Sequence, residues 1–393
     1  MTSRVLIGFA DALAAIESAW CLADEGYEVH AFARRGSRPP LARLRCVRVV
    51  EVTPPEEDAP ACARELAAIA AGIGAVAALP LDDHAVWLCD RMTSVGAKPV
   101  VVGPTGGLAV LALNKLEQLQ LAGSAGLTVP FTAEAGASAP GAGPWVVKPA
   151  LAVELRGNRL HRAHGRIAAR TQQVSGIAAS IGGPVMVQPL IDGHGEGVFG
   201  VAKDGTAAAL SGHRRVRMMN PRGSGSSACR SIPVAADISG PVHDLIARSG
   251  WSGLFMVELI RDKAGKPWFM ELNGRAWGSM ALARYCGYRY AAWAVRAALD
   301  PGFAPPQQQF PQPDILARHL GREIVHLGTV LARGGAPRLA TVRQVLTVRR
   351  TDRWYNYRPG EADILLRDAW ATIRGQVPRA KANRDGTATG QRR

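Results

Sequence analysis

The sequence predicts an α/β protein in which a doubly wound parallel domain is followed by a larger region of antiparallel strands. Over residues 1–110, apolar strand-like runs alternate with amphipathic helical segments, an order that favours parallel pairing. After residue 110, strand-like runs follow one another through short turns such as "KDGT" and "KAGK", as antiparallel hairpins do. At 393 residues the chain is also long enough for two or three domains.

The expected elements of the N-terminal domain begin with a buried strand at residues 5–9 and a helix that ends near Gly26. Four further segments continue the pattern: a strand at 28–33, a helix near 61–71, a strand at 75–79 and a helix at 83–92. The first turn, "GFADA", lacks the GxGxxG spacing, so we do not expect a dinucleotide site there.

The following region is expected to alternate hairpins with single helices. Residues 133–144, "AEAGASAPGAGP", are rich in Gly, Ala and Pro and are expected to form a mobile linker. The helices are expected at residues 113–122, 166–181, 242–249 and, after residue 281, up to about residue 299. The polar and basic tail, residues 376–393, is expected to be disordered.

Composition narrows the function classes. The net charge of +15 comes almost entirely from arginine, since only 7 of the 47 basic residues are lysine, and a nucleic-acid partner must be considered. We do not expect one, because the basic residues form no block and do not alternate with aromatic residues. The six cysteines are scattered, which favours a reducing compartment. No apolar run is long enough to span a bilayer, so we expect a cytoplasmic protein without membrane partners.

Three polar residues in "WFMELNGRAWGS" are the first candidates for chemistry. Alternation along an extended strand would place Glu271, Asn273 and Arg275 on one face. Glu258 stands on the preceding strand in the otherwise apolar "FMVELI", where an unpaired charge would be costly. Glu258, Glu271 and Asn273 offer hard oxygen ligands that suit Mg²⁺, with Mn²⁺ as an alternative. Equally, Glu258 could face water on an edge strand while Glu271 pairs with Arg275.

Two of the scarce lysines occupy informative positions. Lys148 lies in the apolar strand "WVVKPA", and Lys115 begins an amphipathic helix. A lysine in an apolar setting needs an anion, and a phosphate is a strong candidate. An ion pair of Lys148 with a core carboxylate, or a solvated Lys115, explains either lysine taken alone.

Taken in order, these segments resemble the ATP-grasp superfamily. The similar segments are "NK" before a helix and "GLTVP", the strand "WVVKPA", the segment "VMVQPLIDGHGEG" and the hairpin "VELIRDKAGKPWFMELNGR". The resemblance spans about residues 1–300. Within the superfamily, "GHRRVR", "GSGSS" and "NGRAWGSMALA" resemble the carboxylate–amine ligase branch related to the ATP-binding domains of carbamoyl-phosphate synthase.

The resemblance implies a domain plan and a set of roles. An ATP-grasp domain at 111–300 would comprise a lid at about 111–187 and a metal and substrate subdomain at 188–300, followed by an extension at 301–375. Lys115 and Lys148 would contact ATP phosphates, and Arg275 would meet the transferred phosphoryl group. The remaining roles are adenine contacts for Gln188 and Leu190, ribose contacts for Glu196, and Mg²⁺ ligation by Glu258, Glu271 and Asn273.

The implied activity is an ATP-dependent carboxylate–amine ligase, or a carboxylate–thiol ligase, that works through an acyl phosphate and releases ADP and phosphate. Its partners would be small-molecule substrates, with a homodimer as one arrangement. Arg215 is the residue we expect to hold the acid substrate. A kinase on the same fold and a non-catalytic nucleotide-binding regulatory protein are the alternatives. The segment after Lys148, "PALAVELRGNR", lacks the Gly-rich phosphate loop of many superfamily members.

Overall fold

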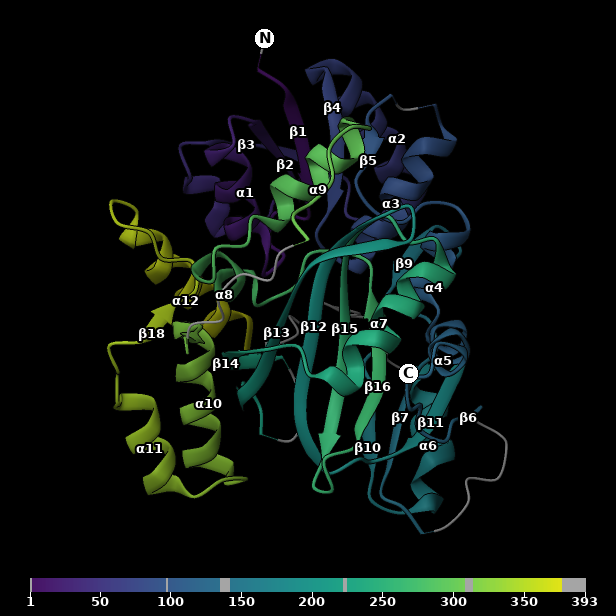
Figure 1. Ribbon diagram of the computed structural model, residues 1–393, viewed down its shortest axis with the longest axis vertical. Helices are drawn as coiled ribbons and strands as arrows, with labels where there is room; N and C mark the ends of the chain where they lie inside the picture. The colour runs from purple at the N-terminus through teal and green to yellow at the C-terminus, as the bar shows by residue number, and fades with distance from the viewer. Residues whose placement is uncertain (1, 97, 135–141, 222–224, 308–313, 377–393) are drawn as a thin grey trace, which may run out of the picture.

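The computed structural model describes residues 2–96, 98–134, 142–221, 225–307 and 314–376. Besides one two-stranded sheet, three larger sheets organise this part of the chain (Figure 1). We call them the parallel sheet (β3-β2-β1-β4-β5), the small sheet (β10-β7-β11-β6) and the large sheet (β16-β15-β12-β13-β14-β17-β18). The parallel sheet lies at one end of the molecule, the large sheet in the middle, and the small sheet beside the large one at the opposite end (Figure 1).

The parallel sheet confirms the expected doubly wound arrangement. Its order reverses between β1 and β4, because β2 and β3 extend one way from β1 while β4 and β5 extend the other. β3 was not among the expected elements. The strands and helices of this part are β1 (Arg4–Gly8), α1 (Ala15–Asp24), β2 (Glu28–Arg34), β3 (Val47–Val52), α2 (Pro55–Ile73), β4 (Ala75–Pro80), α3 (Asp83–Ser94) and β5 (Val100–Val101), with a 3₁₀ turn at Pro40–Arg43.

The small sheet is antiparallel and is covered on one face by α6. The predicted helix at residues 166–181 is wrong in its first half, because Arg166–Ala168 forms β10 and pairs with β7. The elements of this part are α4 (Gly107–Leu113), α5 (Lys115–Ser124), β6 (Ala133–Glu134), β7 (Trp145–Pro149), β8 (Glu154–Arg156), β9 (Arg159–His161), β10 (Arg166–Ala168), a 3₁₀ turn (Thr171–Gln173), α6 (Val174–Ile181) and β11 (Val185–Pro189).

The large sheet is built from the expected hairpins and their continuation. Asp204 and Gly205, both with positive φ, form the two-residue turn of "KDGT", a conformation that an Asp-Gly pair accommodates at low cost. The strands and helices are β12 (Gly193–Lys203), β13 (Thr206–Met218), β14 (Ser226–Ile232), α7 (Ala236–Ser249), β15 (Gly253–Asp262), β16 (Pro267–Asn273), α8 (Met280–Tyr285) and α9 (Tyr290–Leu299).

The two faces of the large sheet pack against different partners. On one face, Val198, Val257 and Leu272 join an apolar cluster with α7 and α5. On the other, Phe199 and Met256 join a cluster with α8, α9 and the parallel domain. We call these the α7 face and the α9 face. Because side chains alternate along a strand, each strand residue can be assigned to one of them.

The C-terminal extension adds two strands to the edge of the large sheet and packs three helices beside them (Figure 1). Its elements are β17 (Leu316–Arg318), α10 (Leu320–Arg333), α11 (Arg338–Leu346), β18 (Asp352–Trp354) and α12 (Ala362–Gln376). Glu323 fastens the extension to the sheet: its carboxylate lies 2.5 Å from Arg217 on β13 and 3.0 Å from Arg318 on β17. Asp352 pairs with Arg318 at 3.3 Å.

We expect Glu323→Gln to destabilise the fold strongly. Glu323 is 1% exposed, and its loss would leave the buried guanidinium of Arg217 without its carboxylate and that of Arg318 with Asp352 alone. Breaking a buried ion pair from one side typically costs about 3–5 kcal/mol. The shift in urea midpoint measures the effect, with Asp363→Asn as the control, because its pair with Arg367 is exposed. Equal midpoints for the two variants would contradict this view of the junction.

Two expectations lie largely outside the described residues. Residues 135–141 of the predicted mobile linker at 133–144 are outside the described part of the chain. Of the predicted disordered tail at 376–393, only Gln376 is described, and it is the last residue of α12.

Candidate active site

The two lysines and the two glutamates singled out in the sequence converge where the small sheet faces the large one. Lys148 lies on β7, and its charge interacts with those of Glu271, Lys115 and Glu258. Lys115 begins α5, where its backbone N–H donates to the Ala150 carbonyl at 2.8 Å just after β7. Residues far apart in the sequence therefore assemble one cluster that contains two cations and two anions.

The carboxylates come from neighbouring strands in register. Glu258 on β15 lies directly opposite Glu271 on β16, and Met256 lies opposite Asn273, so all these side chains occupy the α9 face. Gln118 of α5 holds β16 in place, because its buried amide exchanges hydrogen bonds with both backbone groups of Leu272. The hairpin expected from the alternation in "VELIRDKAGKPWFMELN" is thus present, although β16 is the edge strand and β15 is not.

Glu258 is paired with an arginine rather than with water. Its carboxylate lies 2.7 Å from the Arg215 guanidinium of β13, which crosses β12 to reach it. That crossing requires Gly195, since a Cβ at this position would come within 2.7 Å of the Arg215 side chain. Glu258 raises the pKa of Arg215, against the effect of burial. Glu271 forms no such ion pair within the described residues, including with Arg275.

Lys148 is electrostatically unsatisfied. Burial lowers the pKa of Lys148, Glu271 and Glu258 oppose that shift, and the like charge of Lys115 adds to it. A net lowered pKa means that the described surroundings stabilise the ammonium form less well than water does. An additional anion placed between the two lysines would correct this deficit.

Gln188 shares a face of the small sheet with Lys148. Lys148 pairs with Met186 on β11, and Gln188 lies two residues further along that strand. The Gln188 side chain is buried and donates to the Thr132 hydroxyl at 2.8 Å. The Leu190 side chain is exposed, and its backbone N–H donates to the Pro144 carbonyl at 3.0 Å. The adenine contacts of both residues stay predictions.

Glu196 lies away from the lysine and glutamate cluster, and its expected ribose contact stays a prediction. Glu196 lies on the α7 face, whereas its neighbour Gly197 is the residue opposite Glu258. Its two oxygens are engaged by Arg261 at 3.0 Å and His194 at 2.9 Å. Arg261 continues to Asp237 in the first turn of α7. Glu196 is therefore placed in an ion-pair chain on the face opposite to the lysine and glutamate cluster.

Arg275 joins the cluster to the parallel domain. Its guanidinium donates to Asp83 at 2.7 Å, and Arg162, from the loop after β9, approaches the other oxygen of Asp83 at 3.0 Å. Although burial opposes ionisation, these two arginines hold the pKa of Asp83 below its usual range. Lys115 and Glu271 also interact with this group through their charges. Sequence reasoning had not assigned a role to Asp83 or Arg162, which lie in unremarkable segments.

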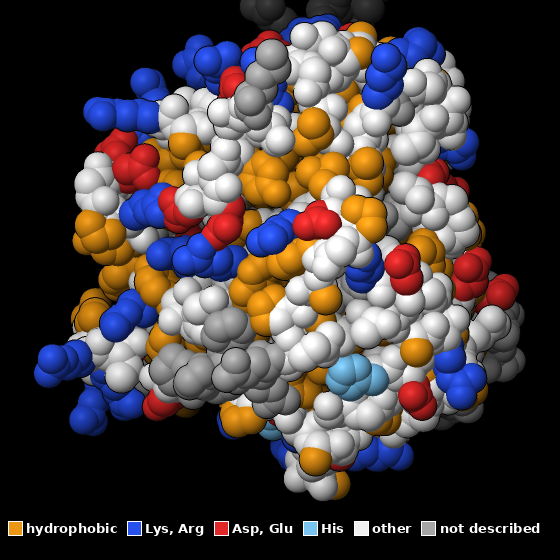
Figure 2. All heavy atoms as spheres, turned by 45° about the horizontal axis from the view of Figure 1, so that its top comes forward, with side chains coloured by type: hydrophobic (Ala, Val, Ile, Leu, Met, Phe, Trp, Pro, Cys, Tyr) orange, Lys and Arg blue, Asp and Glu red, His pale blue; other side chains and the backbone are white. Residues whose placement is uncertain are grey.

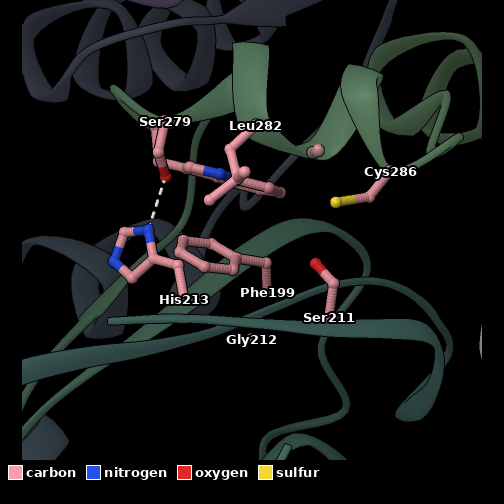
Figure 3. A pocket seen from close by; sticks show the side chains of 9 residues that line it. Phe199, Ser211, Gly212, His213, Ser279, Leu282 and Cys286 are labelled. Carbon is pink, nitrogen blue, oxygen red and sulfur yellow. Dashed lines mark hydrogen bonds between the residues drawn. The ribbon is translucent and has the colours of Figure 1, made fainter. Parts of the chain in front are cut away.

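His213 is a further residue to which the sequence analysis assigned no role. It lies opposite Gly197 on β13, and its Nδ1 lies 2.7 Å from the hydroxyl oxygen of Ser279 beside α8, as Figure 3 shows. Burial lowers the pKa of His213 well below its usual value. The adjoining cavity measures about 10 Å³, space for one water molecule at most and none for a substrate. His213 thus connects β13 to α8 as a neutral side chain.

The donor set of this cluster suits a magnesium ion that is shared with phosphates. Two opposed carboxylates and an amide on one face provide hard oxygen ligands, and Mg²⁺ completes its shell with water and phosphate oxygens. Among the described residues, no group of three or more His, Cys, Asp and Glu side chains could hold a metal alone. An ion here would accordingly need ligands from its substrate.

The outer surface mixes both signs of charge. On the face drawn in Figure 2, Lys and Arg side chains are spread widely and are interleaved with Asp and Glu. Within the described part of the chain, no helix has the length and apolarity required to cross a membrane.

Comparison with solved structures identifies the fold. L-amino acid ligase from Bacillus licheniformis matches with a TM-score of 0.58 and 17% identity, over 76% of this chain and 74% of that one. The biotin carboxylase domain of 2-oxoglutarate carboxylase from Hydrogenobacter thermophilus, a domain dimer in complex with MgADP, ADP and bicarbonate, matches at 0.60 and 14%, over 79% and 73%. N5-carboxyaminoimidazole synthetase from Staphylococcus aureus matches at 0.56 and 13%, over 79% and 78%.

These matches confirm that the chain has the ATP-grasp fold, as the order of its motifs predicted. They concern structure alone, since every identity is below 20%. No family model and no curated protein matches the sequence.

Proposed function

We propose that this protein is an ATP-dependent carboxylate–amine ligase that works through an acyl phosphate. The observation that supports this most strongly is the convergence of Lys115 and Lys148 with Glu258, Glu271 and Asn273 between the small and large sheets. Solved structures with this fold include a ligase and carboxylase domains, one of them with bound MgADP.

The chemical problem is the poor electrophilicity of a carboxylate. Attack of a carboxylate oxygen on the γ-phosphorus of ATP forms a new P–O bond and breaks the bond to the β-phosphate oxygen, which leaves ADP. The amine then attacks the acyl carbon, the C–O bond to phosphate breaks, and the proton of the amine is lost to solvent. The products are an amide, ADP and phosphate.

The residues supply alignment and charge. The ammonium groups of Lys115 and Lys148 would contact phosphate oxygens, which compensates the electrostatic deficit at Lys148. Glu258, Glu271 and Asn273 would hold a magnesium ion, whose contribution is to neutralise phosphate charge. Arg215 and Arg275 border the same face and would orient the acid and the transferred group. Arg215 would have to share its guanidinium between Glu258 and the acid.

Release of ADP and phosphate from ATP tests the proposal. We expect release to require an acid and an amine together when pools of carboxylic acids, including bicarbonate, and pools of amines are offered. Release with acids alone, accompanied by a stable acyl phosphate or a phosphorylated hydroxyl, would favour the kinase instead. Tight ATP binding with no turnover in any combination would favour a regulatory protein.

A further inference from the structure

Three arginines meet where the large sheet joins the C-terminal extension, and they are not equally satisfied. Arg217 donates three hydrogen bonds to Glu323. Arg318 donates to Glu323, Asp352 and two backbone carbonyls. Both guanidinium groups therefore have acceptors matched to their fork of N–H donors.

Arg322, in the first turn of α10, differs from both. Within the described part of the chain its guanidinium has one recorded hydrogen bond, a 3.0 Å contact to the backbone carbonyl of Ser226. It forms no ion pair with any described residue, and the nearby carboxylate of Asp368 is engaged by His319 and Asn356. Burial lowers the pKa of Arg322, although an arginine remains charged at neutral pH. The Arg322 guanidinium is thus a partly exposed cation with N–H donors available to a further acceptor.

The surroundings of Arg322 connect it to the α9 face of the large sheet. Its charge interacts with that of Arg215, which reaches Glu258, and with the buried groups of Cys229 and Tyr355. Cys229 lies directly opposite Arg215 on β14. The Tyr355 hydroxyl is buried near Arg322 and the Cys229 thiol without a nitrogen or oxygen partner among the described residues. Burial raises the pKa of Tyr355 well above its usual value, so it remains a hydrogen-bond donor.

Two guanidinium groups therefore adjoin one end of the proposed active site, and the Tyr355 hydroxyl and the Cys229 thiol lie beside them. Two cations in proximity repel each other unless an anion lies between them. Glu258 compensates Arg215 on the side of the metal ligands. Arg322 interacts with the charge of Asp368, but among the described residues it forms no ion pair with that carboxylate, which contacts His319 and Asn356 instead. A planar carboxylate of the substrate matches the geometry of a guanidinium, which can donate two parallel hydrogen bonds to it.

We propose that Arg322, together with Arg215, binds a second carboxylate of the acid substrate, which makes the preferred acids dicarboxylates. This inference rests on the proposed function and specifies its substrate class. It also gives the extension a direct role, since α10 would supply the specificity-determining residue. The reacting carboxylate would lie towards Glu271, and the second would lie between Arg215 and Arg322.

Direct binding tests the inference without requiring turnover. The probes are matched acids measured by calorimetry with a non-hydrolysable ATP analogue and Mg²⁺ present: aspartate with asparagine, glutamate with glutamine, and succinate with succinamate. We expect at least one diacid to bind the wild-type protein roughly 10- to 100-fold more tightly than its monoamide. Arg322→Gln should remove that ratio while leaving the affinity for the monoamide and the analogue unchanged, and Arg322→Lys should restore part of it.

Arg333→Gln serves as the matched control, because Arg333 is exposed in the last turn of α10. Equal affinities for diacid and monoamide in every pair would overturn the inference on the wild-type protein alone, even if Arg322→Gln fails to fold. An undiminished ratio of diacid to monoamide affinity in Arg322→Gln would also overturn it. The same holds if Arg322→Gln weakens the binding of inorganic phosphate, measured as a further probe, but not the binding of any diacid. Failure of the ligase reaction with the diacid ratio intact would instead count against the proposed function only.

Discussion

Glu271→Gln is expected to remove most Mg²⁺-dependent ATP turnover while leaving the fold nearly intact. Glu271 lies opposite Glu258, forms no ion pair with a described residue and is only partly buried. Its charge partly offsets that of Lys148 without a direct contact, so its loss should cost little stability. The amide keeps the shape but loses the anionic ligand that a hard cation prefers. We expect a drop of roughly 100-fold or more in kcat, the scale on which catalytic electrostatic groups act.

Glu196→Gln is the matched control on the opposite face of the large sheet. Because Glu196 bonds Arg261 and His194 there, this variant should lower the melting temperature and retain Mg²⁺-dependent turnover at saturating ATP. The reverse result, with turnover lost in Glu196→Gln and kept in Glu271→Gln, would show that the ion is bound elsewhere. Steady-state kinetics at several Mg²⁺ concentrations and thermal melts distinguish the two variants.

Lys148→Ala is expected to weaken ATP binding and to reduce turnover by orders of magnitude. The variant removes a cation whose neighbours do not fully compensate it, so it should raise the melting temperature slightly or leave it unchanged. ATP affinity measured by calorimetry distinguishes a phosphate-binding role of Lys148 from a structural one. A large loss of thermal stability with normal ATP affinity would mean that Lys148 is a structural ion-pair partner of Glu271.

The lowered pKa of Lys148 also predicts a pH dependence. The lysine is charged below its pKa and neutral above it, so a lowered pKa makes the charge disappear at a lower pH than in an ordinary lysine. ATP affinity should therefore decline as pH rises towards 10, whereas Lys148→Arg should keep its affinity across that range. Identical alkaline profiles for the two proteins would contradict this assignment.

Sequence patterns were informative wherever chemistry and strand alternation coincided. Glu258, Glu271 and Asn273 could be placed together because apolar neighbours marked both strands and "KAGK" marked the turn between them. Glu196 could not be placed, because a strand of glycines and polar residues does not disclose which face it presents. A shift of one residue would move it to the other side of the sheet.

Contacts between side chains that are far apart in the sequence could not be predicted either. Arg275 meets Asp83 from another domain, and nothing near either residue indicates the pairing. Arg215 and Arg217 would share one face of a regular strand, but an irregularity between them sends Arg215 to Glu258 and Arg217 to Glu323. The extension lay outside the motifs altogether, so the sequence offered no reason to single out Arg322.

The measurement that tests the central claim most directly is oxygen transfer from the acid to phosphate. Acids labelled with ¹⁸O in their carboxylates are incubated with ATP, Mg²⁺ and amines, and the released phosphate is analysed by mass spectrometry. Formation and aminolysis of an acyl phosphate predict ADP together with phosphate that contains one ¹⁸O atom from the acid. Unlabelled phosphate, or cleavage of ATP to AMP and pyrophosphate, would contradict the account.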